Sequence, residues 1–396
     1  MIKNSKIINE NKITSADIAV GIPTLNEVDN IAFVVKKVDQ GLNKYFKNRK
    51  AVIINVDNHS LDGTKEAFLN VKTKNAKIYI STSPGIRGKG NNFYNLFSYI
   101  QKLGSKAVAV VDADLKSITP EWPNILLKPI LNGWDYITPY YARSEYDGTI
   151  TNHICYPLIY GLFGYDIRQP IGGDFSFSGK LAASWLKHKW HKTTKQYGID
   201  IFMTLNAIEG GFKIAQAGLG AKIHKPSAPK LGPMFSQVIT TLFKNIIIDK
   251  KRCFTLAKTH EVPYFGKKQM EKPQTVSVDY KGMKATSIFN FHANEDILRR
   301  GLSSSVYKAL KKMYDKEDLR INSNLWYKII YDAVYAYDRT DLSAGLIEAL
   351  KPLYFGRVIS FFKLTLDKSF EICEQKINNQ AEKFWKNRNY LIKKYK

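Results

Sequence analysis

The sequence has few cysteines, and their placement does not indicate a disulfide framework or a zinc site. The three cysteines, Cys155, Cys253 and Cys373, are odd in number and far apart in the chain. None belongs to a Cys-x-x-Cys pair, the spacing on which disulfide-rich and zinc-binding domains often rely. We therefore predict three buried free thiols.

Long apolar segments are also missing. The longest stretches without a charged residue, such as 154–165 and 231–243, are shorter than the roughly 20 apolar residues that a membrane-spanning helix needs. The first six residues, MIKNSK, lack the apolar core of a signal peptide. We therefore expect a soluble cytoplasmic protein.

Acidic residues are scarce. The chain has 35 acidic and 60 basic residues, which gives a formal net charge of +25. The basic residues concentrate between 222 and 272 and again in the tail at 393–396. Such an excess favours anionic substrates, anionic lipid surfaces or nucleic acid, or it reflects a lysine-rich composition without a partner. Because we recognise no nucleic-acid-binding motif, we do not expect nucleic acid as the partner.

The 396 residues, 44% of them hydrophobic, suggest two units or one large α/β unit with an appendage. From residue 17 to about 225, short apolar strands alternate with amphipathic helices, which is typical of a mostly parallel sheet covered on both faces. After about 226 the strand signals fade and long aromatic, lysine-rich segments follow. We predict an α/β domain over 1–228 and a mainly helical region over 229–396. Its aromatic stripes lead us to expect an oligomer, most simply a homodimer.

Two acids follow a buried strand. Asp112-Ala113-Asp114 comes at the end of the apolar run 107–111. A strand that delivers two carboxylates to its carboxyl end can build a site for Mg²⁺ or Mn²⁺, and such a cation commonly neutralises a diphosphate. The alternative is a solvated turn. In open α/β sheets, ligands bind beyond the carboxyl ends of the strands, where Asn26, Asp57 and Arg87 are also expected.

A glycine-rich segment supports a diphosphate site. Gly85-Ile86-Arg87-Gly88-Lys89-Gly90 places two cations among three glycines just before an expected helix over 88–103. Glycines allow close backbone approach, and a helix N-terminus favours anions. The spacing matches neither the dinucleotide-binding fingerprint nor the Walker A motif, which argues against a dinucleotide cofactor and against ATP hydrolysis.

Together, these motifs resemble the retaining glycosyltransferases of the GT-A fold. The resemblance is closest to mannosylglycerate synthase, glucosylglycerate synthase and glucosyl-3-phosphoglycerate synthase, and it extends from about residue 19 to 227. It implies an α/β, Rossmann-like nucleotide-diphospho-sugar transferase domain that uses a GDP-sugar or a UDP-sugar. It also implies a base-reading role for Asp57. The residues expected to bind the donor are Pro23, Leu25, Glu27, Asp57, Arg87, Gly88, Lys89, Asp112 and Ala113.

The resemblance supplies a third metal ligand. His224, in the segment AKIHK, would join Asp112 and Asp114, with the donor diphosphate completing the coordination of Mg²⁺ or Mn²⁺. Without the resemblance, one of seven histidines would be read as a hydrogen-bonded surface residue.

The acceptor side of the resemblance is the most diagnostic. Arg143 and Thr151 match residues that hold the glycerate carboxylate in these relatives, and arginine suits a planar carboxylate. Phosphoglycerate-using relatives carry an arginine two residues before that threonine, where this chain has Thr149. Free glycerate is therefore favoured over 3-phosphoglycerate.

The sugar is expected to meet a further set of residues. Gly172 and Gly173 would let the backbone approach it, while Asp174 and Asp200 would accept hydrogen bonds from hydroxyl groups. Helix capping is the alternative for each aspartate.

The sequence predicts a metal-dependent enzyme that transfers glucose or mannose to D-glycerate, with retention and without a covalent nucleophile. Such a product belongs to the compatible solutes. Asp200, Asp174 and Arg143 are the expected catalytic residues. Two alternatives are a glucosyl-3-phosphoglycerate synthase and a membrane-surface transferase with a lipid-linked acceptor.

Overall fold

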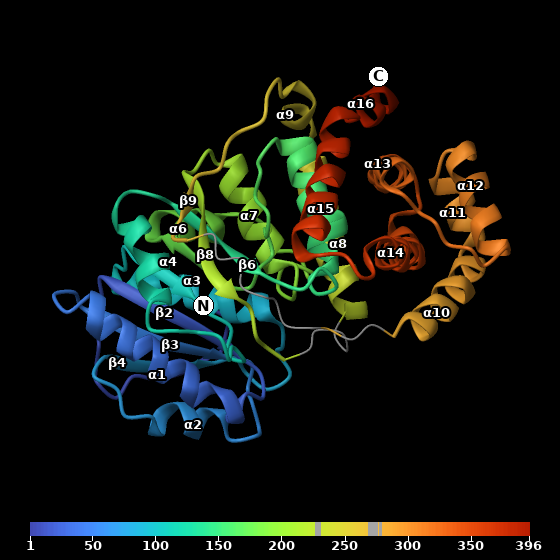
Figure 1. The fold of residues 1–396 in the computed structure, drawn as a ribbon. Helices are drawn as coiled ribbons and strands as arrows, with labels where there is room; N and C mark the ends of the chain where they lie inside the picture. Colours follow the sequence, from blue (N-terminus) through green and yellow to red (C-terminus); the bar gives the residue numbers. More distant parts are fainter. Residues whose placement is uncertain (226–230, 268–275, 277–278) are drawn as a thin grey trace. The chain divides into compact units, whose positions relative to one another are not determined.

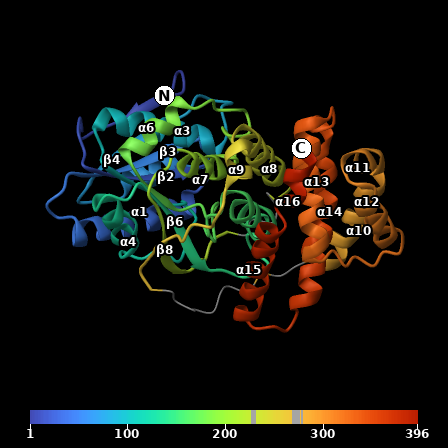
Figure 2. The same ribbon diagram turned by 90° about the horizontal axis from the view of Figure 1, so that it is seen from above.

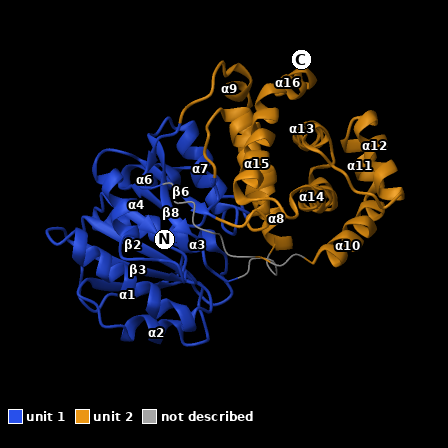
Figure 3. Ribbon diagram, in the orientation of Figure 1, with its two compact units in different colours: residues 1–142, 169–227, 262–274 blue, residues 143–168, 228–261, 275–396 orange. Residues whose placement is uncertain are grey.

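The computed structural model describes all residues except 226–230, 268–275 and 277–278. The chain divides into two compact units, which we describe separately (Figures 1 and 3). Unit 1 comprises 1–142, 169–227 and 262–274, and unit 2 comprises 143–168, 228–261 and 275–396.

This division differs from the single boundary expected at residue 228. The segment 143–168 packs with helices of the C-terminal region. The Trp326 indole donates a hydrogen bond to the His153 carbonyl (2.6 Å), and the Gln380 amide donates one to the Asn152 carbonyl (2.9 Å). Both contacts are remote in sequence, and the sequence pattern alone does not reveal them.

A mixed sheet forms the centre of unit 1. In the part that the structure describes, its strand order is β1-β4-β3-β2-β5-β7-β6-β8-β9. The pairs β4–β3, β3–β2 and β2–β5 are parallel, whereas β7 runs antiparallel to β5 and to β6. The strands are β1 (Lys6–Ile8), β2 (Ile18–Thr24), β3 (Ala51–Asp57), β4 (Ala76–Ser81), β5 (Ala107–Val110), β6 (Tyr136–Ala142), β7 (Phe175–Ser178), β8 (Ile214–Ala221) and β9 (Tyr264–Phe265).

Helices cover both faces of this sheet, which confirms the predicted α/β class. The helices of unit 1 are α1 (Val28–Tyr45), α2 (Thr64–Asn70), α3 (Lys89–Leu103), α4 (Trp122–Leu131), α6 (Gly179–Lys187) and α7 (Ile199–Glu209). Helix α1 buries Val34 and Val38 in a core that contains Val20 of β2. Leu96 of α3 lies against Gly21, the next residue of β2, and a Cβ at Gly21 would collide with it. Because neighbouring strand residues face opposite sides, α1 and α3 cover opposite faces.

Unit 2 is almost entirely helical, as predicted. Figure 2 shows α13 and α14 side by side, and α14 also contacts α8, α10 and α11. The helical segments are η1 (Thr151–Cys155), α5 (Tyr156–Leu158), η2 (Ile159–Phe163), α8 (Leu231–Ile248), α9 (Lys250–Thr255), α10 (Tyr280–Ala293), α11 (Glu295–Gly301), α12 (Ser304–Asp315), α13 (Ser323–Arg339), α14 (Ser343–Thr365), α15 (Phe370–Lys386) and α16 (Asn389–Tyr395).

The aromatic stripes of the C-terminal region lie inside unit 2. Tyr354 packs on Phe235 with ring centroids 4.8 Å apart, and Tyr331 packs on Phe384 at 5.3 Å. All four side chains are buried. These aromatic residues form a core, so they no longer support the expected homodimer, which stays a prediction to be tested by light scattering. The three cysteines form no disulfide and are buried, as predicted.

Helix α8 is, among the described helices, long and apolar enough by length and composition to cross a membrane, with a mean hydropathy of 1.2. This differs from the expectation that no segment would qualify. However, 44% of its residues are buried in the structure. Because a buried core helix passes the same test, α8 alone is weak evidence for a membrane span.

Candidate active site at the strand ends

The loops after β2 and β3 are joined at the carboxyl edge of the sheet. The Asn26 amide donates to the Ser60 hydroxyl (2.8 Å), and the Glu27 amide donates to the Thr64 hydroxyl (2.8 Å). β2 and β3 are parallel neighbours, so their carboxyl ends lie together. The two loops form one hydrogen-bonded wall of the candidate site.

Asp57, the residue expected to contact the nucleobase, is hydrogen-bonded to other residues of the protein. Its carboxylate accepts hydrogen bonds from the hydroxyls of Thr24 (2.7 Å), Ser60 (2.6 Å) and Tyr79 (2.8 Å) and from the Ser60 amide (2.7 Å). Its side chain is buried. In this structure Asp57 holds its loop in place, because four donors contact a carboxylate that solvent does not reach. The base-reading role of Asp57 stays a prediction.

The other residues expected near the nucleotide lie along the same wall. Pro23 lies half-buried near the end of β2, and Leu25 is exposed. Glu27 is buried and forms an ion pair with Lys225 (2.8 Å). The hydrogen bond that the Lys225 ammonium donates to the Glu27 carboxylate raises the pKa of Lys225.

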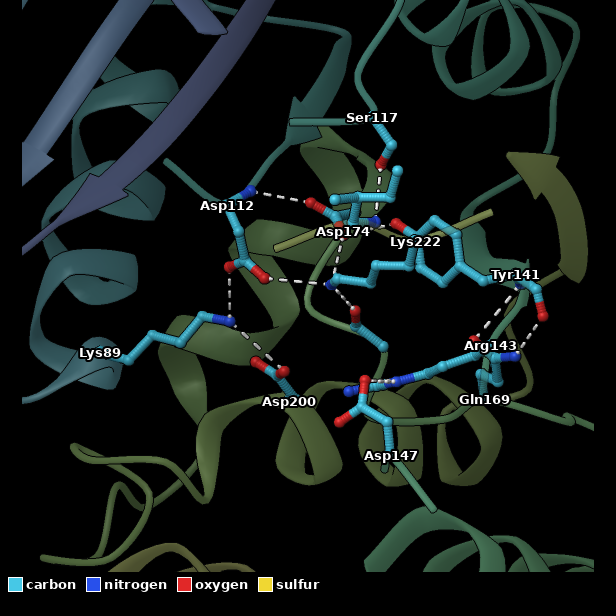
Figure 4. A network of polar contacts seen from close by, with 12 residues as sticks. Lys89, Asp112, Ser117, Tyr141, Arg143, Asp147, Gln169, Asp174, Asp200 and Lys222 are labelled. Atoms are coloured by element: carbon cyan, nitrogen blue, oxygen red, sulfur yellow. Dashed lines mark hydrogen bonds and ion pairs between the residues drawn. The ribbon is translucent and has the colours of Figure 1, made fainter. Parts of the chain in front are cut away.

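A network of acids and lysines lies beyond the end of β5 (Figure 4). The Lys89 ammonium contacts Asp112 (3.0 Å) and Asp200 (3.5 Å). The Lys222 ammonium contacts the other oxygen of Asp112 (3.3 Å), Asp174 (2.9 Å) and the Gly172 carbonyl (2.8 Å). Thus the structure brings Lys89, Asp112, Asp174 and Asp200 together, with a second acid-binding lysine, the buried Lys222, that was not expected.

Burial and neighbouring charges shift the pKa values of Asp112, Asp114 and Asp200. Burial alone would raise the pKa of Asp112, but Lys89 and Lys222 outweigh it and hold that pKa well below its usual range. Burial, together with the charge of Asp112, raises the pKa values of Asp114 and Asp200. Burial would lower the pKa of Lys89, yet Asp112 and Asp200 raise it. Lys89 and Asp112 are therefore charged at neutral pH.

Asp174 is an internal residue. Its side chain is fully buried, and one oxygen accepts from the Asp112 amide (2.7 Å). The other accepts from Lys222 and from the Tyr141 hydroxyl. Protein donors occupy both oxygens and solvent does not reach them, so the expected contact with a sugar hydroxyl stays a prediction that these contacts do not favour. Asp174 instead fixes the backbone of Asp112 and the ammonium of Lys222.

Asp200 has the free acceptor that Asp174 lacks. It lies in the first turn of α7, and its side chain is 10% exposed. One oxygen contacts Lys89, while Oδ1 is buried without a hydrogen-bond partner among the described residues. A buried carboxylate oxygen without a donor is costly, and a bound hydroxyl group would satisfy it.

The two acids of the Asp112-Ala113-Asp114 motif differ in availability. Both oxygens of Asp112 contact lysines, and Ala113 is buried between the acids. Asp114 is half-buried, and no hydrogen bond or ion pair of it is found in the described part of the chain. His224 is close enough for its charge to oppose the rise in the pKa of Asp114 that burial causes. A half-buried carboxylate without a cationic contact, near an imidazole, fits a divalent cation.

The glycine-rich segment has a different role from the expected one. A Cβ at Gly88 or Gly90 would collide with the backbone of residues 194–196. The Gly90 amide donates to the Gln196 carbonyl (3.1 Å), and the Asn91 amide donates to the Lys195 carbonyl (3.0 Å). The amides of Gly90 and Asn91 are therefore not available to a phosphate. Arg87 is exposed and Lys89 points to Asp112, so the cations of this segment remain placed to meet a diphosphate.

Gly172 and Gly173 likewise serve close internal packing. A Cβ at Gly172 would collide with Pro139, and one at Gly173 would collide with the Asp112 carboxylate. Gly173 also has a φ of 93°, which favours glycine. In this structure the two glycines make room for the Asp112 carboxylate and for the Pro139 ring, instead of approaching a sugar as expected.

The residues expected to bind the acceptor belong to unit 2. The Arg143 Nε donates to Asp147 (2.6 Å), a pair also drawn in Figure 4. Thr151 begins η1 and is 3% exposed. Thr149 is 5% exposed, and its hydroxyl shares a hydrogen bond with the buried Tyr354 hydroxyl. Thr149 stands where phosphoglycerate-using relatives are expected to carry an arginine. Here that position holds an uncharged pair of hydroxyl groups.

Sequence reasoning missed Lys222 and Tyr141, which contact the acids of the site. Tyr141 donates to Asp174, and the Lys222 ammonium lies 5.0 Å from its ring centroid. One signal was present: Lys222 comes two residues before His224, and alternate residues of an extended segment point the same way.

Comparison with known proteins gives one family and several similar structures. A family model for the glycosyltransferase domain of mannosylglycerate synthase matches residues 24–225, just over half of the chain. No curated protein sequence matches significantly.

The similar solved structures include glucosyl-3-phosphoglycerate synthase from Mycobacterium tuberculosis in several complexes. The complex with Mn²⁺, UDP and phosphoglyceric acid has 24% identity and a TM-score of 0.47, and the match covers 58% of this chain and 78% of that one. For the complex with Mg²⁺ and UDP the values are 23%, 0.46, 58% and 79%. At these values the similarity in structure does not define an activity. The family match, with the mixed sheet described above, confirms the predicted GT-A fold.

Proposed function

The chain belongs to the family of the mannosylglycerate synthase glycosyltransferase domain, and we propose that it transfers glucose or mannose from a nucleotide diphosphate sugar to D-glycerate with retention. The observation that carries this proposal is the group of Lys89, Asp112 and Asp200 beyond β5, next to Asp114. It combines cationic and anionic side chains in a partly desolvated site, where electrostatic stabilisation of a leaving diphosphate is most effective.

On the donor side, Lys89 and the exposed Arg87 supply positive charge to the diphosphate. Asp114 and His224 would hold Mg²⁺ or Mn²⁺, because Asp114 has no cationic contact among the described residues. The bound metal would neutralise diphosphate charge. Asp112 contributes indirectly, since it holds the Lys89 ammonium in place at 3.0 Å.

At the reacting carbon, Asp200 is proposed to accept a hydrogen bond from a hydroxyl of the sugar or the acceptor, through its unpartnered Oδ1. No described side chain stands out as a covalent nucleophile. We therefore propose attack of the acceptor hydroxyl on the face that the diphosphate leaves, with the acceptor proton passing to a donor phosphate oxygen.

On the acceptor side, Arg143 is proposed to bind the glycerate carboxylate together with Thr151. The Asp147 carboxylate orients the guanidinium through Nε. The neutral Thr149–Tyr354 pair offers no cation to an acceptor phosphate, which supports glycerate over 3-phosphoglycerate.

A donor and acceptor matrix tests the proposal. UDP-glucose, GDP-glucose and GDP-mannose are each incubated with D-glycerate or 3-phosphoglycerate, with Mn²⁺, Mg²⁺ or a chelator, and the products are separated by chromatography. Asp114→Asn should remove most transfer, whereas Asp296→Asn, at a side chain 66% exposed in α11, should not. Full activity of Asp114→Asn in chelator would contradict the metal site.

The acceptor assignment has a separate test. Arg143→Ala should raise the KM for D-glycerate about thirtyfold, because a charge-assisted hydrogen bond is worth on the order of 2 kcal/mol. The KM for the donor sugar should stay within about twofold. Transfer only to 3-phosphoglycerate or to a lipid-linked acceptor, unaffected by Arg143→Ala, would leave the glycosyltransferase activity standing and exclude glycerate.

A further inference from the structure

His59 lies in the turn after β3 with an unusual backbone conformation. Its φ is 58°, in the left-handed region that favours glycine. A non-glycine residue in this region is energetically unfavourable, and such residues cluster at binding sites, where the surrounding structure holds them. A glycine would adopt this backbone conformation without strain, so the presence of a histidine here indicates a role for its side chain.

The neighbours of His59 hold its backbone in this position. Asn58 accepts a hydrogen bond from the Gly88 amide (2.7 Å) through its side chain and also bonds Asn92. Ser60 donates to Asp57 (2.6 Å) and accepts from the Asn26 amide (2.8 Å). His59 is thus fixed between the loop after β2 and the segment that carries Arg87 and Lys89.

The ring of His59 is not used by the folded chain. It is half-buried, and no hydrogen bond, ion pair or ring contact of it is found within the described ranges. Asp57, two residues earlier, has every carboxylate position filled by protein donors. Of the two, only the His59 side chain remains able to meet a ligand.

We propose that His59 is a specificity-determining residue that contacts the nucleobase of the donor, by stacking or by hydrogen bonding of its imidazole. This inference rests on the proposed use of a nucleotide diphosphate sugar. The loop that carries His59 is joined through Asn58 to the segment expected to meet the diphosphate, so a base attached to that diphosphate lies within reach of the same loop. The unfavourable backbone conformation is then retained because the ring contributes to donor binding.

The test compares a nucleotide with a probe that has no base. Binding of UDP, GDP and inorganic pyrophosphate is measured by calorimetry in the presence of Mn²⁺ for the full chain and for His59→Gly. Glycine keeps the left-handed conformation and removes only the ring. The Kd of the preferred nucleoside diphosphate should rise about tenfold, as for loss of one stacking contact, while the Kd of pyrophosphate stays the same.

Two further variants control for the effect of placing a new residue at a left-handed backbone position. Glu317→Gly, at another non-glycine residue with a φ of 51°, lies in unit 2 and should change neither Kd. His59→Asn, which tolerates the left-handed region, should behave as His59→Gly does. The melting temperature of His59→Gly should not fall, because a strained residue is replaced by glycine.

Equal nucleotide affinity in the wild type and His59→Gly would overturn the inference. So would an equal loss of nucleotide and pyrophosphate binding, since the ring would then act on the diphosphate or on the loop as a whole. If the wild type binds pyrophosphate but neither UDP nor GDP, the proposed donor class itself fails, which is a distinguishable result.

Discussion

Lys222 shows how a single buried charge organises the acids of the site. Its side chain is 4% exposed, and its ammonium lies between Asp112 and Asp174. Two carboxylates this close repel each other unless a cation separates them. Lys222 therefore acts as a fixed internal cation of unit 1.

Removing this cation should destabilise unit 1. Lys222→Met would leave Asp174 buried without its charged partner, and loss of one member of a buried ion pair costs about 3–5 kcal/mol. Denaturant unfolding should show this loss, and the double variant Lys222→Met/Asp174→Asn should recover part of it. Lys180→Met is the control, because Lys180 is 74% exposed and its contact with Asp135 is 3.7 Å. Equal stability of Lys222→Met and Lys180→Met would contradict the role of Lys222.

His153 should make the stability of unit 2 depend on pH. Burial, and then the nearby charge of Arg357, hold the pKa of His153 well below its ordinary value of 6.5. The unfolded chain binds a proton near pH 6.5 while the folded chain does not, so stability falls as the pH drops below 6.5.

The matching experiment is urea unfolding at pH 7.5, 6.5 and 5.5. Between pH 6.5 and 5.5 this one group contributes up to about 1.4 kcal/mol per pH unit. His153→Phe should lose that slope, whereas His292→Gln, at a partly exposed histidine of α10, should keep it. A wild type and a His153→Phe variant with the same slope would show that His153 does not titrate as described.

At the scale of elements, the first helix of unit 1 depends on another loop. The residue before α1, Glu27, makes no side-chain cap hydrogen bond. Instead Asp62 accepts from the Val28 amide (3.1 Å) and from the Thr64 amide (3.0 Å). One side chain therefore caps α1 and forms the turn that begins α2, which ties both loops to the strand ends.

Asp62→Ala should lower the free energy of unfolding by about 1 kcal/mol, the usual cost of a lost helix cap. It should also weaken donor binding, because the loops after β2 and β3 lose a connection. Asp29→Ala removes an acid from the same turn of α1 and is the control. If both variants unfold at the same denaturant concentration, Asp62 is not the cap of α1.

At the scale of the whole molecule, neither compact unit is a continuous piece of chain. The chain enters unit 2 at Arg143, returns to unit 1 at Gln169, and crosses again near 228, 262 and 275. Residues 143–168 thus lie in the first half of the sequence but pack with helices from its last third.

A fragment of residues 1–228 should not fold as an independent domain. It would keep η1, α5 and η2 without α13 and α15, and so expose their buried side chains, including Ile154, Leu158 and Phe163. We expect aggregation on expression, or a far-UV spectrum that lacks a cooperative thermal transition. A monomeric fragment with a cooperative transition and nucleotide affinity would contradict this, and would restore the boundary expected at 228.

The sequence alone determined the fold class and most of the strand-end positions. The apolar run 107–111 and the spacing of Val34 and Val38 follow from local backbone geometry. Apolar side chains on one face recur about every two residues in a strand and every 3.6 in a helix, so these elements can be predicted from the sequence. Because parallel strands share an edge, residues that follow them in sequence can be expected together in space. Lys89 and Asp112 do lie together, and Asp200 of α7, which was expected only from the family resemblance, joins them.

Only the tertiary structure decided what each of these side chains contacts. Asp57 and Asp174 are saturated by donors from distant strands, and Lys222 occupies the space between two acids. Such contacts depend on packing between segments far apart in the chain, and no local period encodes them. The assignment of 143–168 to unit 2 has the same cause, since the energy of burying its apolar side chains comes from helices more than 150 residues away.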